Sequence, residues 1–211
     1  MKIYAISGLG ADQRVFNHLT LDFELITIDW ITPLHNEYIK EYSKRLSEVI
    51  DTNVEFCLIG VSFGGLIATE IDKILQPKKV ILISSVQTKD ELRPIYKWVG
   101  KSRILKFLPK FLFNPPRFLA KYIMGAKNSK LFYEILDDTD LSFVKWALQE
   151  FTAWQNTTQS TIVLKINGTK DKLIPPKGTT RTKLIEGGEH FMIVDSANEI
   201  SKIINFELRN T

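Results

Sequence analysis

The sequence contains one cysteine, and no apolar run in it approaches the ~18 residues that a membrane-spanning helix requires. The chain is therefore not expected to be an integral membrane protein. A single cysteine cannot form an internal disulfide, and its place in the apolar run FCLIG predicts that Cys57 is a buried, inert thiol. The N-terminal residues MKIYAIS show no leader region or cleavage site, so we expect a cytoplasmic protein without a signal peptide.

Cofactor-binding motifs are also missing from the sequence. There is no glycine-rich phosphate loop with a lysine and no Cys/His cluster, so nucleotide hydrolysis and zinc chemistry have no support. Gly8-x-Gly10 follows one predicted strand and Asp29 ends the next, which imitates a dinucleotide-binding fingerprint. The third glycine would fall at Gln13, so the pattern fails where the helix must pack closest to the sheet. We therefore expect neither a cofactor nor a metal.

The chain has 211 residues, which is enough for one well-buried domain and too few for two ordinary ones. Its 44% hydrophobic and 25% charged content is typical of a soluble globular protein. Near-continuous apolar strands that alternate with helical patterns predict a doubly wound α/β fold, with a mainly parallel sheet covered by helices on both faces. The six predicted strands cover residues 2–6, 23–29, 56–60, 79–84, 161–166 and 182–185.

Three amphipathic helices are predicted within this alternation. Apolar residues recur at three- and four-residue steps over residues 37–50 and 64–75, which draws one apolar stripe on each helix. The last helix is predicted to begin with Ser196 and Glu199, whose three-residue spacing is that of a capping box. Each of these two side chains would then satisfy a free backbone donor at the start of the helix.

The alternation stops after the fourth strand, over residues 87–156. This stretch is rich in aromatic residues and in prolines, which break long helices, so we predict several short helices. We interpret it as a helical cap inserted into a core domain made of residues 1–86 and 157–211. The prolines of the cap are Pro94, Pro109, Pro115 and Pro116.

The basic residues are concentrated in this cap. Between Leu92 and Tyr133 there are ten Lys or Arg residues and no Asp or Glu, although the net charge of the whole chain is only +4. We favour the interpretation that the aromatic side chains pack onto the sheet while the lysines form a solvated rim. Two alternatives stay open: the cap steers anionic substrates, such as acyl groups on phosphate-bearing carriers, or it contacts an anionic membrane surface reversibly. Nucleic-acid binding is not expected, because no recognition module is visible.

A serine between glycines follows the third predicted strand. In the stretch LIGVSFGG, Gly60-x-Ser62-x-Gly64 stands where an apolar strand meets an amphipathic helix, as in a nucleophile elbow. Such a turn is so tight that its neighbouring positions must be small, and the serine hydroxyl points out of the sheet. The pattern therefore predicts that Ser62 is a nucleophile rather than an ordinary turn residue.

A serine hydroxyl is a poor nucleophile until a base removes its proton. We expect this base among the three histidines of the chain. His190 follows the last strand in IEGGEHFM, where the two glycines let the chain turn and bring the imidazole beside Ser62. His18 stands in the helix-like run DQRVFNHL, and His35 stands just before the helix predicted over residues 37–50. For these two we expect ordinary surface or capping roles.

The base needs an acid to orient it, and this acid is expected at another strand end. Asp171 follows the fifth strand in the run INGTKD and is the first candidate. Asp90, after the fourth strand, is the reserve. Asp195 is expected to lie only near the start of the final helix.

The chain order Ser62, Asp171, His190 is the order of the α/β-hydrolase fold. Four motifs, SGLGAD, GVSFGG, INGTKD and GGEHF, occur at the positions along the chain where this fold would have them. On these motifs the sequence resembles a small member of the α/β-hydrolase superfamily over nearly the whole chain. The resemblance implies a Ser-His-Asp triad that cleaves carboxylic esters or thioesters of small or acyl-chain substrates through an acyl-enzyme. Two alternatives are a catalytically silent binding protein of the same fold and a lyase that uses the same triad.

The resemblance also implies where the substrate binds. An oxyanion hole is expected from the backbone amides of Leu9 and Phe63. Family members commonly carry a histidine where this sequence has Ser7. Gly8, the Phe63 side chain and Trp98 of the cap are expected to contact the substrate, and the aromatic cap favours an apolar acyl group.

Overall fold

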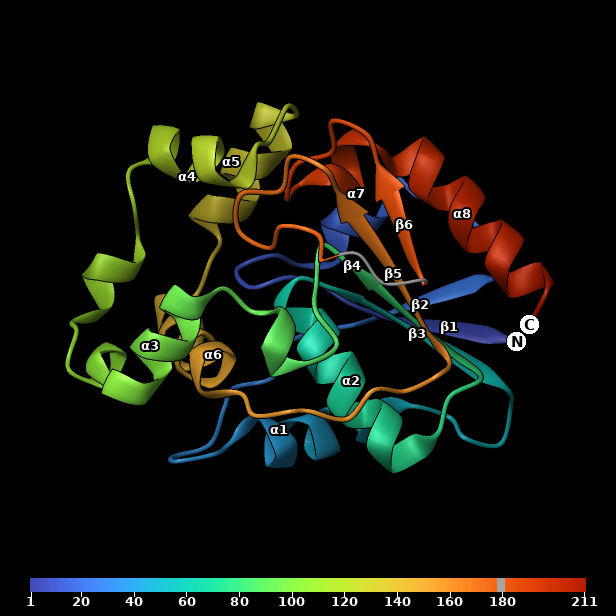
Figure 1. Cartoon of the computed structure of the whole chain (residues 1–211), viewed down its shortest axis with the longest axis horizontal. Coiled ribbons are helices and arrows are strands. Elements are labelled where there is room, and N and C mark those ends of the chain that lie inside the picture. The colour runs from blue at the N-terminus through green and yellow to red at the C-terminus, as the bar shows by residue number, and fades with distance from the viewer. Residues whose placement is uncertain (178–180) are drawn as a thin grey trace.

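A computed structural model describes residues 1–177 and 181–211 of the chain. Its centre is a six-stranded sheet in the order β2-β1-β3-β4-β5-β6, in which every pair of neighbours is parallel (Figure 1). The strands are β1 (Lys2–Ile6), β2 (Glu24–Ile28), β3 (Phe56–Val61), β4 (Lys79–Ile83), β5 (Val163–Gly168) and β6 (Thr182–Ile185). The predicted α/β fold with a parallel sheet is confirmed, and the strand ends differ from the predicted ones by only a few residues.

Helices cover both faces of the sheet because the strands present apolar side chains to both sides. Ile3 and Ala5 of β1 belong to one core cluster, whereas Tyr4 and Ile6 belong to the other. This alternation follows from the two-residue period of a strand. One face carries α1 (Ile39–Leu46) and α2 (Phe63–Leu75), and the opposite face carries η1 (Gln13–Phe16), α7 (Met192–Asp195) and α8 (Ala197–Arg209) (Figure 1).

An inserted helical region separates β4 from β5, as predicted. Figure 1 shows this region at one end of the molecule, beyond the carboxyl ends of the central strands, while both termini lie at the other end. Its elements are η3 (Lys89–Glu91), α3 (Pro94–Ser102), η4 (Ile104–Lys106), η5 (Lys110–Phe113), α4 (Arg117–Met124), α5 (Ser129–Asp137) and α6 (Leu141–Ala153). No helix in the described part of the chain is both long and apolar enough to cross a bilayer.

Two predictions about helix ends are wrong in detail. The helix predicted over residues 37–50 is shorter and ends in a 3-10 turn, η2 (Ser47–Val49). At the start of α8, the Ser196 side chain makes no capping hydrogen bond. The reason is that α7 runs directly into α8: the Ser196 amide donates to the Met192 carbonyl at 2.8 Å, and its backbone is not in the extended conformation of a usual N-cap.

A capping box does occur, but at the start of the inserted region. The Glu91 side chain accepts hydrogen bonds from the backbone amides of Gln87 and Thr88, both at 3.1 Å. Its other carboxylate oxygen pairs with the ammonium group of Lys165, a residue of β5 that is only 3% exposed. Removing one member of such a buried pair leaves an unpaired buried charge, which lowers the stability of the fold. This contact therefore ties the beginning of the insertion to the sheet.

The far end of the insertion is tied to the core by two further carboxylates. The indole N–H of Trp154 donates to buried Glu70 of α2 at 2.7 Å. Glu150 of α6 accepts the backbone N–H of Ile39 at 2.8 Å, so it caps α1 from outside that helix. Burial raises the pKa of Glu150.

Cys57 of β3 offers a test of the packing. Its side chain is fully buried, and burial raises the pKa of the thiol to about 11. Because only the thiolate reacts, we expect native protein at pH 8 to be alkylated by iodoacetamide about a hundredfold more slowly than protein unfolded in urea. Mass spectrometry over time measures both rates. Rapid alkylation of the native protein would contradict the close packing of β3.

Candidate active site

The turn between β3 and α2 holds Ser62 in an unusual backbone conformation. Its φ is 51° and its ψ is −118°, a region that non-glycine residues rarely occupy and that costs about 1–3 kcal/mol. The flanking glycines allow this turn because backbone atoms pass where a side chain would begin. A Cβ atom on Gly60 would lie 2.5 Å from the Gly64 carbonyl oxygen, and one on Gly64 would lie 2.2 Å from the Ser7 carbonyl oxygen.

The structure brings together the three side chains that the sequence singled out. The Ser62 hydroxyl lies 2.9 Å from Nε2 of His190, and Nδ1 of His190 lies 2.8 Å from Oδ2 of Asp171. The side chains of His190 and Asp171 are 3% and 0% exposed, whereas Ser62 is partly exposed. A buried imidazole and a buried carboxylate thus form a hydrogen-bonded chain to a partly exposed hydroxyl.

The loops that carry Asp171 and His190 hold each other in place. Gly168 and Gly188 are in contact, since a Cβ atom on Gly168 would lie 2.2 Å from the Gly188 carbonyl oxygen. That carbonyl also accepts the Lys170 amide at 2.9 Å. Close backbone packing therefore sets the spacing between Asp171 and His190.

Asp171 is also part of a turn within its own loop. Its Oδ1 accepts the backbone amides of Leu173 at 2.9 Å and Ile174 at 2.8 Å, which leaves Oδ2 for His190. These bonds fix the carboxylate so that it can select one imidazole orientation. Asp171 therefore both closes a turn in its own loop and contacts the imidazole of His190.

The loop after β1 runs past the serine. Gly8 is next to Ser62, because a Cβ atom built on Gly8 would lie 3.4 Å from the serine Cβ. The loop is braced at Ala11, whose carbonyl accepts the Ser7 hydroxyl at 2.8 Å and the Trp30 indole N–H at 3.0 Å. Ser7 is buried and supplies an internal brace at the position where the family commonly has histidine.

Ser85, which follows β4, is a contact of the site that sequence reasoning missed. Its hydroxyl donates to the carbonyl of Ser62 at 2.7 Å, and it packs so closely on Gly65 that a Cβ there would lie 2.2 Å from the Ser85 oxygen. The strained turn therefore has a hydrogen bond from a neighbouring strand end. Two serines after an apolar strand, SS in LISSV, are the only signal in the sequence.

A cavity of about 390 Å³ opens beside Ser62 and His190, between the sheet and the inserted helices. None of the described residues around it is charged, and few are polar. Its apolar walls come from η5, α4, α5, α6 and the segment after His190. Residues that form it include Gly8, Leu9, Phe113, Ala120, Ile123, Met124, Phe132, Ile135, Val144 and Phe191.

Comparison with known proteins shows the family of this chain. Residues 4–202 match the alpha/beta hydrolase family. The chain belongs to that family. A comparison with curated proteins found no match.

Solved structures of similar fold cover nearly all of this alpha/beta hydrolase. A thermophilic esterase from Thermogutta terrifontis has a TM-score of 0.75 and 14% identity, over 100% of this chain and 90% of that one. A lipase-esterase related protein from Clostridium acetobutylicum has a TM-score of 0.70 and 17% identity, over 96% and 92%. The RedJ thioesterase from the prodiginine pathway of Streptomyces coelicolor has a TM-score of 0.69 and 12% identity, over 98% and 90%. At these identities the likeness shows a shared fold.

Two of the side chains expected at the substrate lie elsewhere. Phe63 is 1% exposed and packs against Trp30, Phe143 and Trp146 in the core cluster on the α1–α2 side, so its ring does not line the cavity. The reason is that Phe63 begins α2, and its side chain points into the helical layer. Trp98 lies on α3, is 62% exposed and does not line the cavity either. Of the three expected contacts, only Gly8 lies at this cavity.

The other candidate residues also have defined places. Asp90 is exposed and pairs with Lys97 at 3.3 Å, which leaves Asp171 as the acid at the histidine. His18 and His35 are exposed. Asp195 does more than stand near a helix start, because its carboxylate accepts the backbone amides of Lys127 and Asn128 in the insertion at 2.8 and 3.0 Å.

The insertion is joined to both loops of the site. The Thr139 hydroxyl donates to the Gly10 carbonyl at 2.8 Å, in the loop after β1. The Phe191 amide, next to His190, donates to the Met124 carbonyl at the end of α4 at 3.0 Å. These bonds position the cavity walls relative to Ser62.

The crowded turn at Ser62 generates a stability prediction. We expect Gly64→Ala to lower the free energy of unfolding by about 3 kcal/mol or more, because the new Cβ meets backbone atoms that cannot move away. Urea denaturation followed by circular dichroism measures the change. Gly8→Ala is the matched control, since its Cβ would make only ordinary contacts, the nearest at 3.4 Å. Equal stability of both variants and wild type would contradict the close approach at this turn.

Proposed function

We propose that this protein is a serine hydrolase that cleaves carboxylic ester or thioester bonds and takes an apolar acyl group. The observation that carries the proposal is the hydrogen-bonded chain from Ser62 through His190 to Asp171 at the edge of an uncharged cavity. A hydroxyl, an imidazole and a carboxylate in this order form the catalytic constellation of acyl transfer. Esterases and a thioesterase among proteins of similar fold support the same reaction class.

In the first step, the Ser62 oxygen attacks the carbonyl carbon while Nε2 of His190 takes the hydroxyl proton. Asp171 holds the Nδ1–H, which keeps Nε2 free as the acceptor and stabilises the imidazolium that forms. The proton then passes from His190 to the leaving oxygen or sulfur. An alcohol or thiol departs, and the acyl group stays on Ser62.

The negative charge that develops on the carbonyl oxygen needs fixed donors. We assign them to the backbone N–H groups of Leu9 and Phe63, which make no hydrogen bond within the described residues. Phe63 is the first residue of α2, where a helix leaves its N–H groups unpaired. Each donor in such a hole lowers the barrier by about 3–4 kcal/mol. The Phe63 amide can serve the site although its ring packs in the opposite direction.

In the second step, water replaces the leaving group. His190 takes a proton from the water as its oxygen attacks the acyl carbon, and then returns that proton to the Ser62 oxygen. The products are a carboxylic acid and the free serine. Detection of the acid product separates this hydrolase from the lyase alternative.

The first test is labelling with a fluorophosphonate probe, which reacts with activated serines. We expect a single adduct on Ser62 by peptide mapping, and none on Ser62→Ala. We expect Ser62→Ala and His190→Ala each to lose turnover of activated esters by about four orders of magnitude or more, and the double variant to lose little more, because the groups act as a unit.

Ser201→Ala is the control for this labelling, because Ser201 is a buried serine of α8 whose hydroxyl donates to the Ala197 carbonyl and not to a histidine. A well-folded protein that gives no adduct would favour the catalytically silent binding protein. Full activity of Ser62→Ala would overturn the mechanism.

A second test concerns the cavity as the acyl site. Ala120 of α4 lines it, so Ala120→Leu should reduce its volume. We expect kcat/KM for the longest accepted acyl ester to fall at least about tenfold while that for the acetate ester is little changed. Ala153→Leu, on the exposed side of α6, is the control. Parallel losses for short and long esters would place the acyl group elsewhere.

A further inference from the structure

The outer side of the insertion exposes an unusual number of apolar side chains. Of seventeen exposed large hydrophobic residues in the described chain, nine lie between Ile95 and Tyr122. Phe107 is 84% exposed, Phe118 74% and Phe111 68%. We call the exposed side chains of residues 93–122 the outer cap surface. Figure 1 shows α3 and α4, which carry much of it, at the end of the molecule opposite the termini.

These exposures contradict, for part of the cap, the interpretation that its aromatic residues pack onto the sheet. Phe132, Phe143 and Trp154 are buried in the core clusters, whereas the aromatic side chains of the outer cap surface are largely exposed. Helix α4 shows why. Ala120, Ile123 and Met124 line the cavity, whereas Phe118 and Tyr122 point outward and are 74% and 66% exposed. A helix that is apolar on two faces needs a second apolar surface to cover it. A cluster of exposed apolar side chains on neighbouring segments of the chain is a feature of interaction sites.

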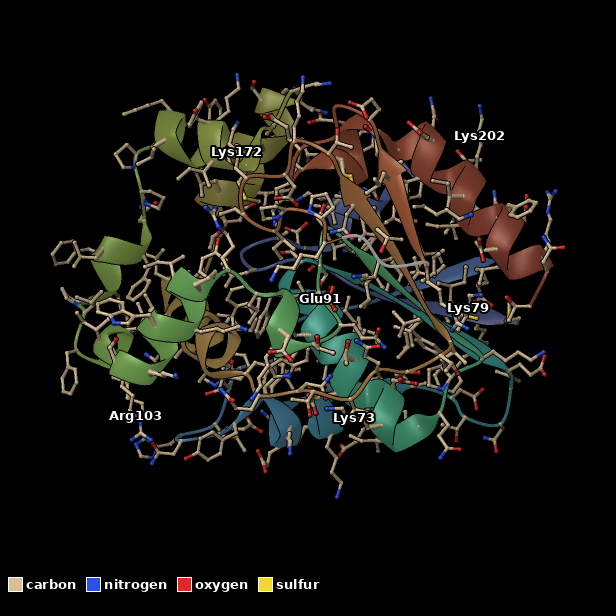
Figure 2. All side chains as sticks on the ribbon, in the orientation of Figure 1. Lys73, Lys79, Glu91, Arg103, Lys172 and Lys202 are labelled. Carbon is tan, nitrogen blue, oxygen red and sulfur yellow. The ribbon has the colours of Figure 1, made fainter. Side chains whose placement is uncertain are left out.

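The charge of the outer cap surface identifies the kind of partner. Eight basic residues lie between Arg93 and Lys121, and the segment contains no Asp or Glu. Carboxylates of neighbouring elements neutralise only part of this charge, since Asp90 pairs with Lys97 and Asp137 pairs with Arg117. In Figure 2 the side chain of Arg103 extends away from the protein at this end. Exposed aromatic rings among cations match an anionic lipid surface, which offers phosphates above an apolar layer.

The outer cap surface also borders the cavity. Leu112 is 54% exposed and at the same time lines the cavity, together with Phe113, Asn114 and Pro115. The exposed apolar side chains therefore continue into the cavity wall. A partner that covers this surface would lie next to the entrance for an acyl chain.

We propose that the outer cap surface docks reversibly onto the anionic surface of a lipid bilayer. Its cations bind the headgroup phosphates, and Phe107, Phe111 and Phe118 enter the interfacial layer. A bilayer is favoured over an acidic protein because the exposed rings are spread along several short helices rather than gathered around one pocket. Docking itself does not require the proposed hydrolase activity, so each can be tested alone.

Vesicle co-sedimentation tests the docking. We expect the wild-type protein to sediment with vesicles that contain equal parts phosphatidylcholine and phosphatidylglycerol, and much less with phosphatidylcholine alone. The bound fraction should fall as salt rises, because exposed charges are screened. Phe107→Ser, Phe111→Ser and Phe118→Ser combined should weaken binding about tenfold. The matched control combines Val49→Ser, Leu184→Ser and Phe206→Ser, which are 50–66% exposed and lie on η2, β6 and α8.

A charge-matched pair of variants separates this surface from the effect of net charge. Lys101→Glu, Lys106→Glu and Lys110→Glu combined should abolish binding to anionic vesicles. Lys40→Glu, Lys44→Glu and Lys202→Glu change the net charge equally, on exposed positions of α1 and α8, and should leave most of the binding intact. Equal losses for the two triple variants would overturn the proposal, as would a wild-type protein that does not sediment with anionic vesicles.

Trp98 supplies an independent readout of contact. Among the four tryptophans, all within the described ranges, Trp98 alone is classed as exposed. We expect its fluorescence to shift to shorter wavelength on anionic vesicles, and Trp98→Phe to remove that shift. Binding without any change at Trp98 would place the lipid on another surface and contradict the proposal.

Discussion

The site depends on the absence of side chains at two positions of one turn. Gly64 passes so close to the carbonyls of Ile6 and Ser7 that no Cβ fits, and Gly60 meets the first turn of α2 in the same way. This contact presses α2 against the carboxyl ends of the strands and forces Ser62 into a positive φ. The helix start, the serine hydroxyl and the loop after β1 therefore share one small volume. The hydrogen bond from Ser85 is one of the contacts that offset the strain of that conformation.

Much of the fold could be predicted because the strands are short, apolar and separated by amphipathic helices. The parallel sheet, the insertion after β4 and the Ser62–Asp171–His190 order all follow from local patterns and from the rule that carboxyl ends of parallel strands meet at one edge. The ends of the helices were harder to predict from the sequence. The Ser196 capping box failed because Ser196 is the single residue between α7 and α8 and its amide is bonded to α7, which depends on the preceding residues rather than on the spacing.

At the site, the direction in which side chains point was the main feature that the sequence did not predict. Phe63 follows Ser62 directly in the sequence. Because it is the first residue of α2, however, its ring points away from the cavity and packs against Trp30 and Phe143. Trp98 does not line the cavity, because its side chain on α3 is exposed to solvent. Ser85 and Asp195 act through backbone groups of distant segments, and a local pattern such as SS in LISSV does not say which distant group a side chain will contact.

The insertion lies between two strands that are neighbours in the sheet, since β4 pairs directly with β5. The sheet register therefore does not depend on how long the intervening segment is or how many helices it contains. In evolutionary terms, the cavity walls and the elements that carry Ser62, Asp171 and His190 can diverge at different rates. A cavity of another shape can arise by replacing a surface segment while these three residues keep their places.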